Sequence, residues 1–337
     1  MVNGTASGPV GIGAVGVGGW AAGMVDKIHQ SDKLRLVGCF DASEDAKRQA
    51  AEKCGCTAAS SVEELLNDPA VEGVVVVTPN FTHRDIVVAA ARAGKHAFTD
   101  KPIANNIADA YAMIDACREA GVILAVGHNF RRFGSQRKFK ELIADGAAGD
   151  VVTVEANFSH AGGMGLTPGH WRSYPDKAPA LPLIQLGVHC ADTLQHVLGP
   201  VSEVSSFMDH MAIPAENLDV TATLLRFQSG VIGYLGSNYA TPAVHYVNLY
   251  GTKANLYSGF GRQVRIVWAG GKGEEIIEGP EIDDRLEELE EFGDCIRTGA
   301  KPEVDGEMGL LNLAVVRAAL KSSQEGRTVK LAELLAR

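Results

Sequence analysis

The chain has little of what marks a secreted or membrane-spanning protein. No apolar run approaches the roughly 20 residues that a membrane span needs, and residues 1–9 lack the basic flank, apolar core and cleavage site of a signal peptide. The 6 cysteines are scattered, and Cys54-Gly55-Cys56 has no second Cys/His pair at zinc spacing. We therefore expect reduced thiols, no metal site and a soluble, cytoplasmic protein.

Basic clusters are also missing. No run is rich in Lys or Arg and the formal net charge is −10, so nucleic acid is not an expected partner. The 337 residues exceed what one ordinary core organises, and 46% of them are hydrophobic, which is enough to fill two cores. The composition thus predicts a globular protein of two domains.

A glycine-rich stretch near the start carries the first functional signal. The apolar run 10–15 is followed by Gly16-x-Gly18-x-x-Ala21 and then by a helix-compatible segment, 22–29. A dinucleotide-binding fingerprint requires this order of strand, tight turn and helix, with phosphates at the helix N-terminus. An overlapping match that starts at Gly11 has only the polar residues 1–9 before it, and so lacks the strand. The predicted cofactor loop is therefore Gly16, Val17, Gly18, Gly19 and Trp20.

The next apolar run, 34–40, ends at Asp41. A carboxylate at the end of the second strand accepts a hydrogen bond from the 2′-hydroxyl of an adenosine ribose and repels a 2′-phosphate. Ala42 and Ser43, which follow, offer no arginine for such a phosphate. NAD is therefore the expected cofactor, and NADP is less favoured.

Strands and helices alternate through the first 127 residues. Fully apolar runs such as 71–77 are typical of parallel strands buried on both faces, and the alternation predicts a doubly wound α/β sheet. In such sheets the ligand lies across the carboxyl ends of the strands. One of these ends carries further expected cofactor residues: Thr78, Pro79, Asn80 and His83.

These residues together resemble one family, that of glucose-fructose oxidoreductase, inositol dehydrogenase and the MocA-type oxidoreductases. The resemblance covers about residues 10–331 and is more specific for fold and cofactor than for substrate. It rests on the glycine loop, on 78–83, on Gly94-Lys95-His96 leading into Lys101-Pro102, on Gly187-Val188-His189 with Asp192, and on tail motifs at 302–309 and 325–327.

The resemblance implies a flexible tail (1–9), an N-terminal Rossmann dinucleotide-binding domain (10–127) and a C-terminal α/β domain (128–337) with a large, mostly antiparallel open sheet. In this family the sheet often mediates homodimers or homotetramers. Several runs after residue 150 alternate apolar and polar residues, as a half-buried sheet requires. These runs are 151–159, 219–227, 231–239 and 245–250.

Two residues carry the expected chemistry. Pro102 fixes the backbone just after Lys101 and aims its amine from a strand end, and the resemblance makes Lys101 the catalytic lysine. Asp100 takes the place of the family's usual Glu, which contacts the nicotinamide ribose. His189 stands where the family has its acid/base histidine, on a predicted helix, 183–198. Positions 185, 189, 192 and 196 share one face of that helix.

One position departs from the family pattern. An Asp commonly stands four residues before the histidine, and this chain has Gln185 instead. A glutamine can hydrogen-bond a hydroxyl group but cannot stabilise an imidazolium by charge. The resemblance also implies that Trp171 is an apolar wall of the substrate cleft, with Arg131 and Arg172 as donors. A surface ion pair is an equal alternative for each arginine.

The expected activity is NAD-dependent oxidation of a secondary alcohol in a sugar, sugar acid, inositol or related polyol, or the reverse reduction. His189 takes the hydroxyl proton as hydride leaves for nicotinamide C4, while Lys101 and Gln185 contact the same substrate. Three alternatives stay open: a redox-neutral glycosidase or epimerase that retains NAD, a dihydrodiol dehydrogenase, and a non-catalytic dinucleotide-binding regulator.

Overall fold

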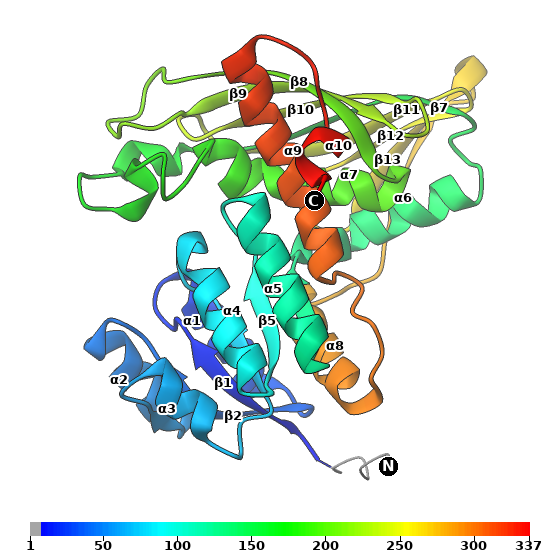
Figure 1. Ribbon diagram of the computed structural model, residues 1–337. Helices are drawn as coiled ribbons and strands as arrows, with labels where there is room; N and C mark the ends of the chain where they lie inside the picture. Colours follow the sequence, from blue (N-terminus) through cyan, green and yellow to red (C-terminus); the bar gives the residue numbers. More distant parts are fainter. Residues whose placement is uncertain (1–7) are drawn as a thin grey trace. The chain divides into compact units, whose positions relative to one another are not determined.

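The computed structural model describes residues 8–337 (Figure 1). Residues 1–7 of the expected tail lie outside this description. The structure divides into two units, and the first unit takes back a segment from later in the chain. The units are residues 8–127 with 283–310, and residues 128–282 with 311–337.

The first unit is built on a parallel sheet of six strands in the order β3-β2-β1-β4-β5-β6. Every residue of β1, β4 and β6 is buried, because helices on both faces keep water away from a parallel sheet. The order reverses between β1 and β4, the switch point of a doubly wound fold. The strands are β1 (Val10–Val15), β2 (Leu34–Phe40), β3 (Thr57–Ala58), β4 (Gly73–Val76), β5 (His96–Asp100) and β6 (Leu124–Gly127).

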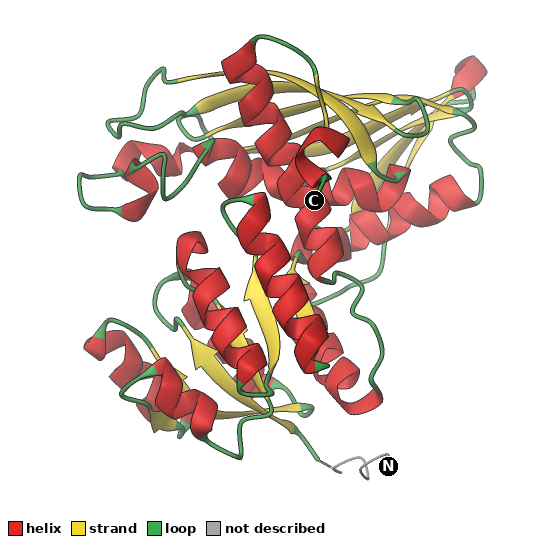
Figure 2. Cartoon of the chain, viewed as in Figure 1, coloured by secondary structure: helices red, strands yellow, loops and turns green. Residues whose placement is uncertain are grey.

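Local signals set the ends of the helices in this unit. Ser43 and Ser61 cap the helices that follow them, since their hydroxyl oxygens accept the N–H groups of Ala46 (3.3 Å) and Glu64 (3.0 Å). Gly121 ends a helix in the left-handed conformation. Helices α4 and α5 lie side by side (Figure 2). The helices before residue 128 are α1 (Trp20–Gln30), α2 (Glu44–Cys54), α3 (Val62–Asn67), α4 (His83–Arg92) and α5 (Ile107–Ala120).

Helix α8 (Asp284–Thr298) completes the core of the first unit. Its side chains Leu289 and Phe292 are fully buried in one cluster with Val10, Leu34 and Phe98. The rings of Phe98 and Phe292 are 5.9 Å apart. Burying one such side chain contributes about 1.5–3 kcal/mol, so the apolar stripe of α8 accounts for the return of this segment.

The second unit is built on a sheet of nine strands in the order β14-β13-β12-β11-β7-β10-β9-β8-β15. β7 and β10 pair in parallel, and the other neighbours are antiparallel. Together the two sheets confirm the expected α/β class, with a Rossmann-type unit and a mostly antiparallel sheet. The strands are β7 (Val151–Ser159), β8 (Val201–Asp209), β9 (Val220–Phe227), β10 (Ile232–Asn238), β11 (Val244–Gly251), β12 (Ala254–Ser258), β13 (Gln263–Trp268), β14 (Glu274–Glu278) and β15 (Val329–Lys330).

Helices cover one face of this sheet. α6 (Gly134–Ala144) packs against β12 and β13, and α7 (Val188–Leu198) packs against β7. The helix expected over 183–198 is divided, because its first turn, Leu183–Gly187, is a π-helix, a form frequent at functional sites. Helix α9 (Gly306–Glu325) begins in the first unit and ends in the second, and α10 (Ala332–Leu335) lies near the C-terminus. Among residues 8–337 no helix is both long and apolar enough to cross a membrane.

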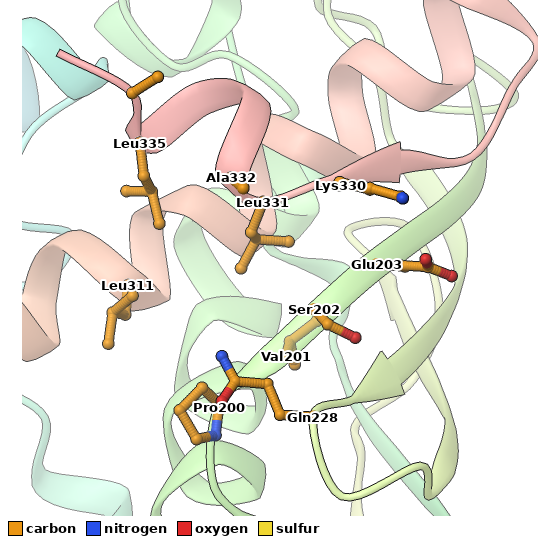
Figure 3. Close-up of a pocket in the computed structure, with 11 residues that line it drawn as sticks. Pro200, Val201, Ser202, Glu203, Gln228, Leu311, Lys330, Leu331, Ala332 and Leu335 are labelled. Carbon is orange, nitrogen blue, oxygen red and sulfur yellow. The ribbon is translucent and has the colours of Figure 1, made fainter.

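A hollow in the second unit lies between β8 and the C-terminal segment (Figure 3). Leu311, Leu331 and Leu335 give it an apolar wall, and Glu203 and Lys330 add charges to its lining. None of the residues expected to bind cofactor or substrate lines this hollow. The expected cofactor residues belong to the first unit, and His189 and Gln185 belong to the second.

Candidate active site

The glycine loop joins β1 to α1. β1 ends one residue before Gly16, and α1 begins at Trp20. Gly16 has φ +83°, and a Cβ atom there would stand 2.6 Å from the carbonyl oxygen of Val77, which leaves no space for a side chain. Gly19 precedes the helix with φ 57°. The fingerprint that starts at Gly16 thus has its strand, turn and helix, whereas Gly11 lies inside β1.

The start of α1 is suited to an anion. Among residues 8–337, the N–H groups of Gly19 and Trp20 have no hydrogen-bond partner, while those of Ala21 and Ala22 bond to the carbonyl oxygens of Gly18 (3.1 Å) and Gly19 (3.3 Å). No acidic residue stands in the first helical turn. Unpaired N–H groups and the helix dipole favour negative charge, so the loop fits the diphosphate of a dinucleotide.

Asp41 lies beside this loop. One carboxylate oxygen accepts the N–H groups of Val17 (2.8 Å) and Gly18 (3.2 Å), and the other accepts that of Ser43 (2.8 Å). A carboxylate has about four acceptor positions, and the side chain is only half-buried. Asp41 can therefore fix the loop and still accept a hydroxyl group.

The loop after β4 carries Thr78, Pro79 and Asn80. Asn80 is 5% exposed, and its side-chain nitrogen is buried without a hydrogen-bond partner in the described part of the chain. The hydroxyl of Thr82 donates to that of Thr78 at 2.7 Å, which helps to order the loop. Leaving a buried donor unpaired costs about 1–3 kcal/mol, so Asn80 fits a donor to a bound ligand.

His83 is placed differently from the other expected cofactor residues. It is fully buried, with Nε2 2.9 Å from the carbonyl oxygen of Thr78 and Nδ1 3.1 Å from that of Pro102. Burial lowers the pKa of this imidazole and favours the neutral ring, which donates from one nitrogen only. His83 therefore lies between the loop after β4 and the segment after β5 and donates to one of these carbonyl oxygens.

Lys101 directly follows Asp100, the last residue of β5. Both side chains are half-buried, and the Lys101–Pro102 peptide bond is cis. The carboxyl edge of the six-stranded sheet therefore holds the glycine loop, Asp41, Asn80 and Lys101. A doubly wound sheet binds its ligand at this edge.

In the second unit, His189 lies on the first turn of α7 and is 5% exposed. The ring of Phe130 stacks on the imidazole, with centroids 3.9 Å apart and planes at 17°. Phe158 (5.9 Å) and the edge of His128 (6.4 Å) also face it. The stacking restricts the plane of the imidazole.

Gln185 lies together with two expected substrate residues. On the π-helical turn before α7, its side-chain oxygen accepts a hydrogen bond from Nε of Arg172 at 3.0 Å. The guanidinium of Arg172 also lies over the ring of Trp171, 4.6 Å from its centroid. The cluster combines amide, guanidinium and indole groups, which suit a ring that carries both hydroxyl groups and C–H bonds.

Arg131 does not belong to this cluster. It is 1% exposed; its Nε donates to one carboxylate oxygen of Asp192 at 2.8 Å, and its Nη1 lies 3.2 Å from Nδ1 of His196. Asn312 donates to the other oxygen of Asp192 at 2.6 Å. Burial alone would raise the pKa of Asp192, but Arg131 and His128 more than offset this and hold it below its ordinary value. The sequence allowed either a substrate role or a surface ion pair for Arg131. In the structure Arg131 forms an ion pair with Asp192, and this pair is buried.

Two family models together cover most of the chain. The model described as an oxidoreductase family with an NAD-binding Rossmann fold matches residues 10–128, and that of the GFO/IDH/MocA C-terminal domain matches residues 136–257. The chain belongs to the Gfo/Idh/MocA oxidoreductase family.

Relatives of the Gfo/Idh/MocA protein cover nearly its whole length. It is 29% identical to a myo-inositol 2-dehydrogenase of Thermotoga maritima, over 96% of this chain and 99% of the relative. It is 26% identical to a 2,7-anhydro-N-acetylneuraminate hydratase of Escherichia coli, over 96% and 97%. The crystal structure of an oxidoreductase from Desulfitobacterium hafniense, named NADPH-dependent, matches with a TM-score of 0.92 at 37% identity and covers 100% of both chains.

Membership in the Gfo/Idh/MocA family sets the class of chemistry. The protein is an oxidoreductase, and its first unit is an NAD-binding Rossmann domain. The unpaired donors of Gly19, Trp20 and Asn80 fit that cofactor. Family membership does not select the substrate.

The family motifs did not single out several residues around His189. Phe130 is next to Arg131, which the family resemblance did single out. Nothing in the sequence indicates that the ring of Phe130 stacks on His189. Asn312 is 120 positions from Asp192 in the chain. Only the packing of α7 against the neighbouring segments shows these contacts.

Proposed function

We propose that the protein is an NAD-dependent dehydrogenase that transfers hydride between a secondary alcohol of a sugar, inositol or related polyol and nicotinamide C4. The observation that carries the proposal is the setting of His189, a buried imidazole four residues after Gln185, whose side chain accepts from Arg172. Oxidation of an alcohol requires a base close to groups that bind hydroxyls. The relative named for myo-inositol supports this substrate class.

Bound NAD supplies the hydride acceptor. Its diphosphate belongs at the loop from Gly16 to Trp20, and its adenosine ribose at Asp41. The unpaired side-chain nitrogen of Asn80 would donate to the cofactor. Asp100 would contact the nicotinamide ribose. Thr78 and Pro79 shape the same loop, and His83 acts through the backbone.

His189 removes the hydroxyl proton during oxidation and returns it during reduction. The stacked ring of Phe130 holds the imidazole plane. Lys101 hydrogen-bonds to the reacting oxygen and shares in proton transfer. Gln185 and Arg172 bind neighbouring hydroxyls, and Trp171 packs against C–H bonds of the ring.

A substrate screen tests this proposal. The purified protein is mixed with NAD and a panel of inositols, sugars and sugar acids, and NADH absorbance is followed. We expect NADH formation with at least one cyclic polyol or sugar, and almost none with the Lys101→Ala variant. No NADH from any member, in a protein shown to bind NAD, would contradict the proposal.

A redox-neutral reaction is the second candidate. The E. coli relative is named a hydratase, and net hydration involves no net oxidation. The same residues would then serve oxidation and later re-reduction of one sugar ring. NAD that stays bound through purification, together with product formed without net NADH, would identify this reaction; mass spectrometry measures both.

We also propose that the open face of the nine-stranded sheet binds a second copy of the chain. A row of paired residues crosses this face in the order Leu224 (56% exposed), Tyr234, Glu155, Asn248, Tyr257, Arg265 and Ile276 (64% exposed). Phe207, in the neighbouring strand, is 85% exposed. Exposed apolar side chains gathered on one face are typical of interfaces, so a homodimer or homotetramer is expected.

Replacing Leu224 by glutamate should reduce the assembly to monomers, because it would bury an unpaired charge in the interface between the two copies. Sedimentation velocity measures the change. Met164, in the short 3-10 helix Ala161–Gly165 and 50% exposed, provides the control, since Met164→Glu should leave the assembly intact. A wild-type protein that is already monomeric at micromolar concentration would refute this interface.

Asp41 should make the protein bind NADH about ten-fold or more tightly than NADPH, because its carboxylate accepts a 2′-hydroxyl and repels a 2′-phosphate. Asp41→Asn keeps an acceptor for the loop N–H groups and removes the charge, so it should narrow the preference. Calorimetry gives both dissociation constants, with Asp45→Ala as a control acid on α2. The D. hafniense relative is named NADPH-dependent. If this protein binds NADPH as tightly as NADH or more tightly, Asp41 does not determine the cofactor preference.

Gln185→Asp should move the acidic limb of the kcat/KM profile for oxidation to higher pH. A carboxylate near His189 stabilises the imidazolium and raises its pKa, so the free base appears only at higher pH. Arg172, 3.0 Å from the Gln185 oxygen, would pair with the new charge and keep the shift to about one pH unit or less.

The double variant Gln185→Asp/Arg172→Gln should therefore show a larger shift than Gln185→Asp alone. Arg172→Gln by itself provides the control for the loss of the guanidinium. A limb that stays in place in both Asp variants would show that position 185 does not neighbour the catalytic base.

A further inference from the structure

An arginine from α8 lies against the start of α1. Arg285 is the second residue of α8, and its guanidinium carbon lies 5.0 Å from the ring centroid of Trp20, the first residue of α1. Trp20 is 52% exposed. A Cβ atom on Gly23, one turn further along α1, would stand 2.9 Å from Nη1 of Arg285. The guanidinium therefore lies along the first two turns of α1, next to the glycine loop.

No protein group in residues 8–337 accepts a hydrogen bond or forms an ion pair with the guanidinium of Arg285. Asp283, two positions earlier, is paired with Lys27 at 2.6 Å and interacts with the Arg285 guanidinium only through longer-range attraction. Other arginines that stack on rings do have such partners. Arg172, over Trp171, donates to Gln185 at 3.0 Å, and Arg265, over Tyr257, donates to Glu274 at 3.0 Å.

Unused donors thus come together at the start of α1. The N–H groups of Gly19 and Trp20 have no partner within the described chain, and the five N–H donors of Arg285 stand beside the same turn. Shielding of an exposed indole would explain the stacking of Arg285. It would not explain why the cation has no acceptor at the loop where the family binds a dianionic diphosphate.

We propose that Arg285 donates to the diphosphate of the bound dinucleotide, with the ring of Trp20 as the support that holds the guanidinium in place. Arginine suits this task because its planar fork matches phosphate oxygens and stacks on aromatic rings. The proposal concerns cofactor binding alone and does not depend on which substrate is oxidised.

Calorimetric titration with ADP-ribose, which carries the diphosphate but no nicotinamide, tests the proposal. Arg285→Leu should raise the dissociation constant for ADP-ribose and for NADH about ten-fold or more, the usual effect of losing a charge-assisted hydrogen bond. Binding by the variant should also depend less on salt, because one cation has been removed from the site. Adenosine, which has no phosphate, should bind both proteins equally.

Arg92→Leu is the matched control. Arg92 is exposed in the last turn of α4, at the other edge of the sheet from the strand ends, so its loss should leave ADP-ribose binding unchanged. Arg285→Lys should recover part of the affinity, because it restores the charge without the planar fork. Should Arg285→Leu fail to fold by circular dichroism, Arg285→Gln replaces it. Unchanged ADP-ribose affinity, or an equal loss of adenosine affinity, would overturn the proposal.

Discussion

Replacing Lys101 or His189 by alanine should lower turnover by about two to four orders of magnitude, the usual contribution of a positioned acid or base. Both variants should keep their affinity for ADP-ribose within a few-fold, because neither residue belongs to the glycine loop. Steady-state kinetics on the substrate found by screening gives turnover, and calorimetry gives the affinity. Near-normal turnover in either variant would make that residue structural.

Lys95 provides a matched control for Lys101. It lies in the same unit at the opposite end of β5, and its ammonium donates to the carbonyl oxygens of Asp68 (3.0 Å) and Val71 (2.7 Å). Lys95→Met should therefore lower stability slightly and leave turnover unchanged. If Lys95→Met loses as much turnover as Lys101→Ala, the loss in both variants comes from a disturbed structure and Lys101 need not be catalytic.

Phe130→Leu separates the chemistry of His189 from its placement. The variant removes the ring that lies 3.9 Å from the imidazole while leaving the base itself. A positioning role predicts a lower kcat and a displaced acidic limb in the pH profile, with little change in KM. A side chain that only fills space would lower stability and leave that limb where it is.

The Rossmann unit could be predicted from the sequence because its determinants are local. Continuous apolar runs indicate strands buried on both faces, and Gly16 is needed where the chain turns at φ +83°. The structure confirms the predicted sheet type and fold class. The π-helical turn over 183–187 was missed, because its apolar residues follow a pattern that also suits an α-helix.

Contacts between distant segments could not be predicted. Leu289 and Phe292 join a core whose other members come from residues 10–125, and no sequence signal names that destination. His83 matched a cofactor motif, yet its ring contacts backbone carbonyls 19 and 5 positions away. Arg131 could be assigned either to a substrate or to a surface ion pair, and no sequence signal indicates that it is 1% exposed and paired with Asp192.

That buried pair leads to a large expected change in stability. Arg131→Met should lower the free energy of unfolding by about 3–5 kcal/mol at pH 7, because it leaves the carboxylate of Asp192 buried without its guanidinium. Urea denaturation followed by circular dichroism measures the loss. Arg118→Met is the control: its side chain is 57% exposed and pairs with Asp115 and Glu307, and exposed pairs contribute about 1 kcal/mol or less.

The pH dependence identifies Asp192 as the cause. In the wild type the pKa of Asp192 is below its unfolded value of 3.8, so its stabilising effect is present above that pH and is lost as the pH falls through the folded pKa. In Arg131→Met burial dominates and raises that pKa, so protonation relieves the unpaired charge and the deficit against wild type should shrink as the pH falls from 7 toward 5. Arg131→Met/Asp192→Asn has no carboxylate to protonate, so its deficit should stay constant over the same range. An Arg131→Met deficit that is equally constant would place the cost in lost packing and not in the charge of Asp192.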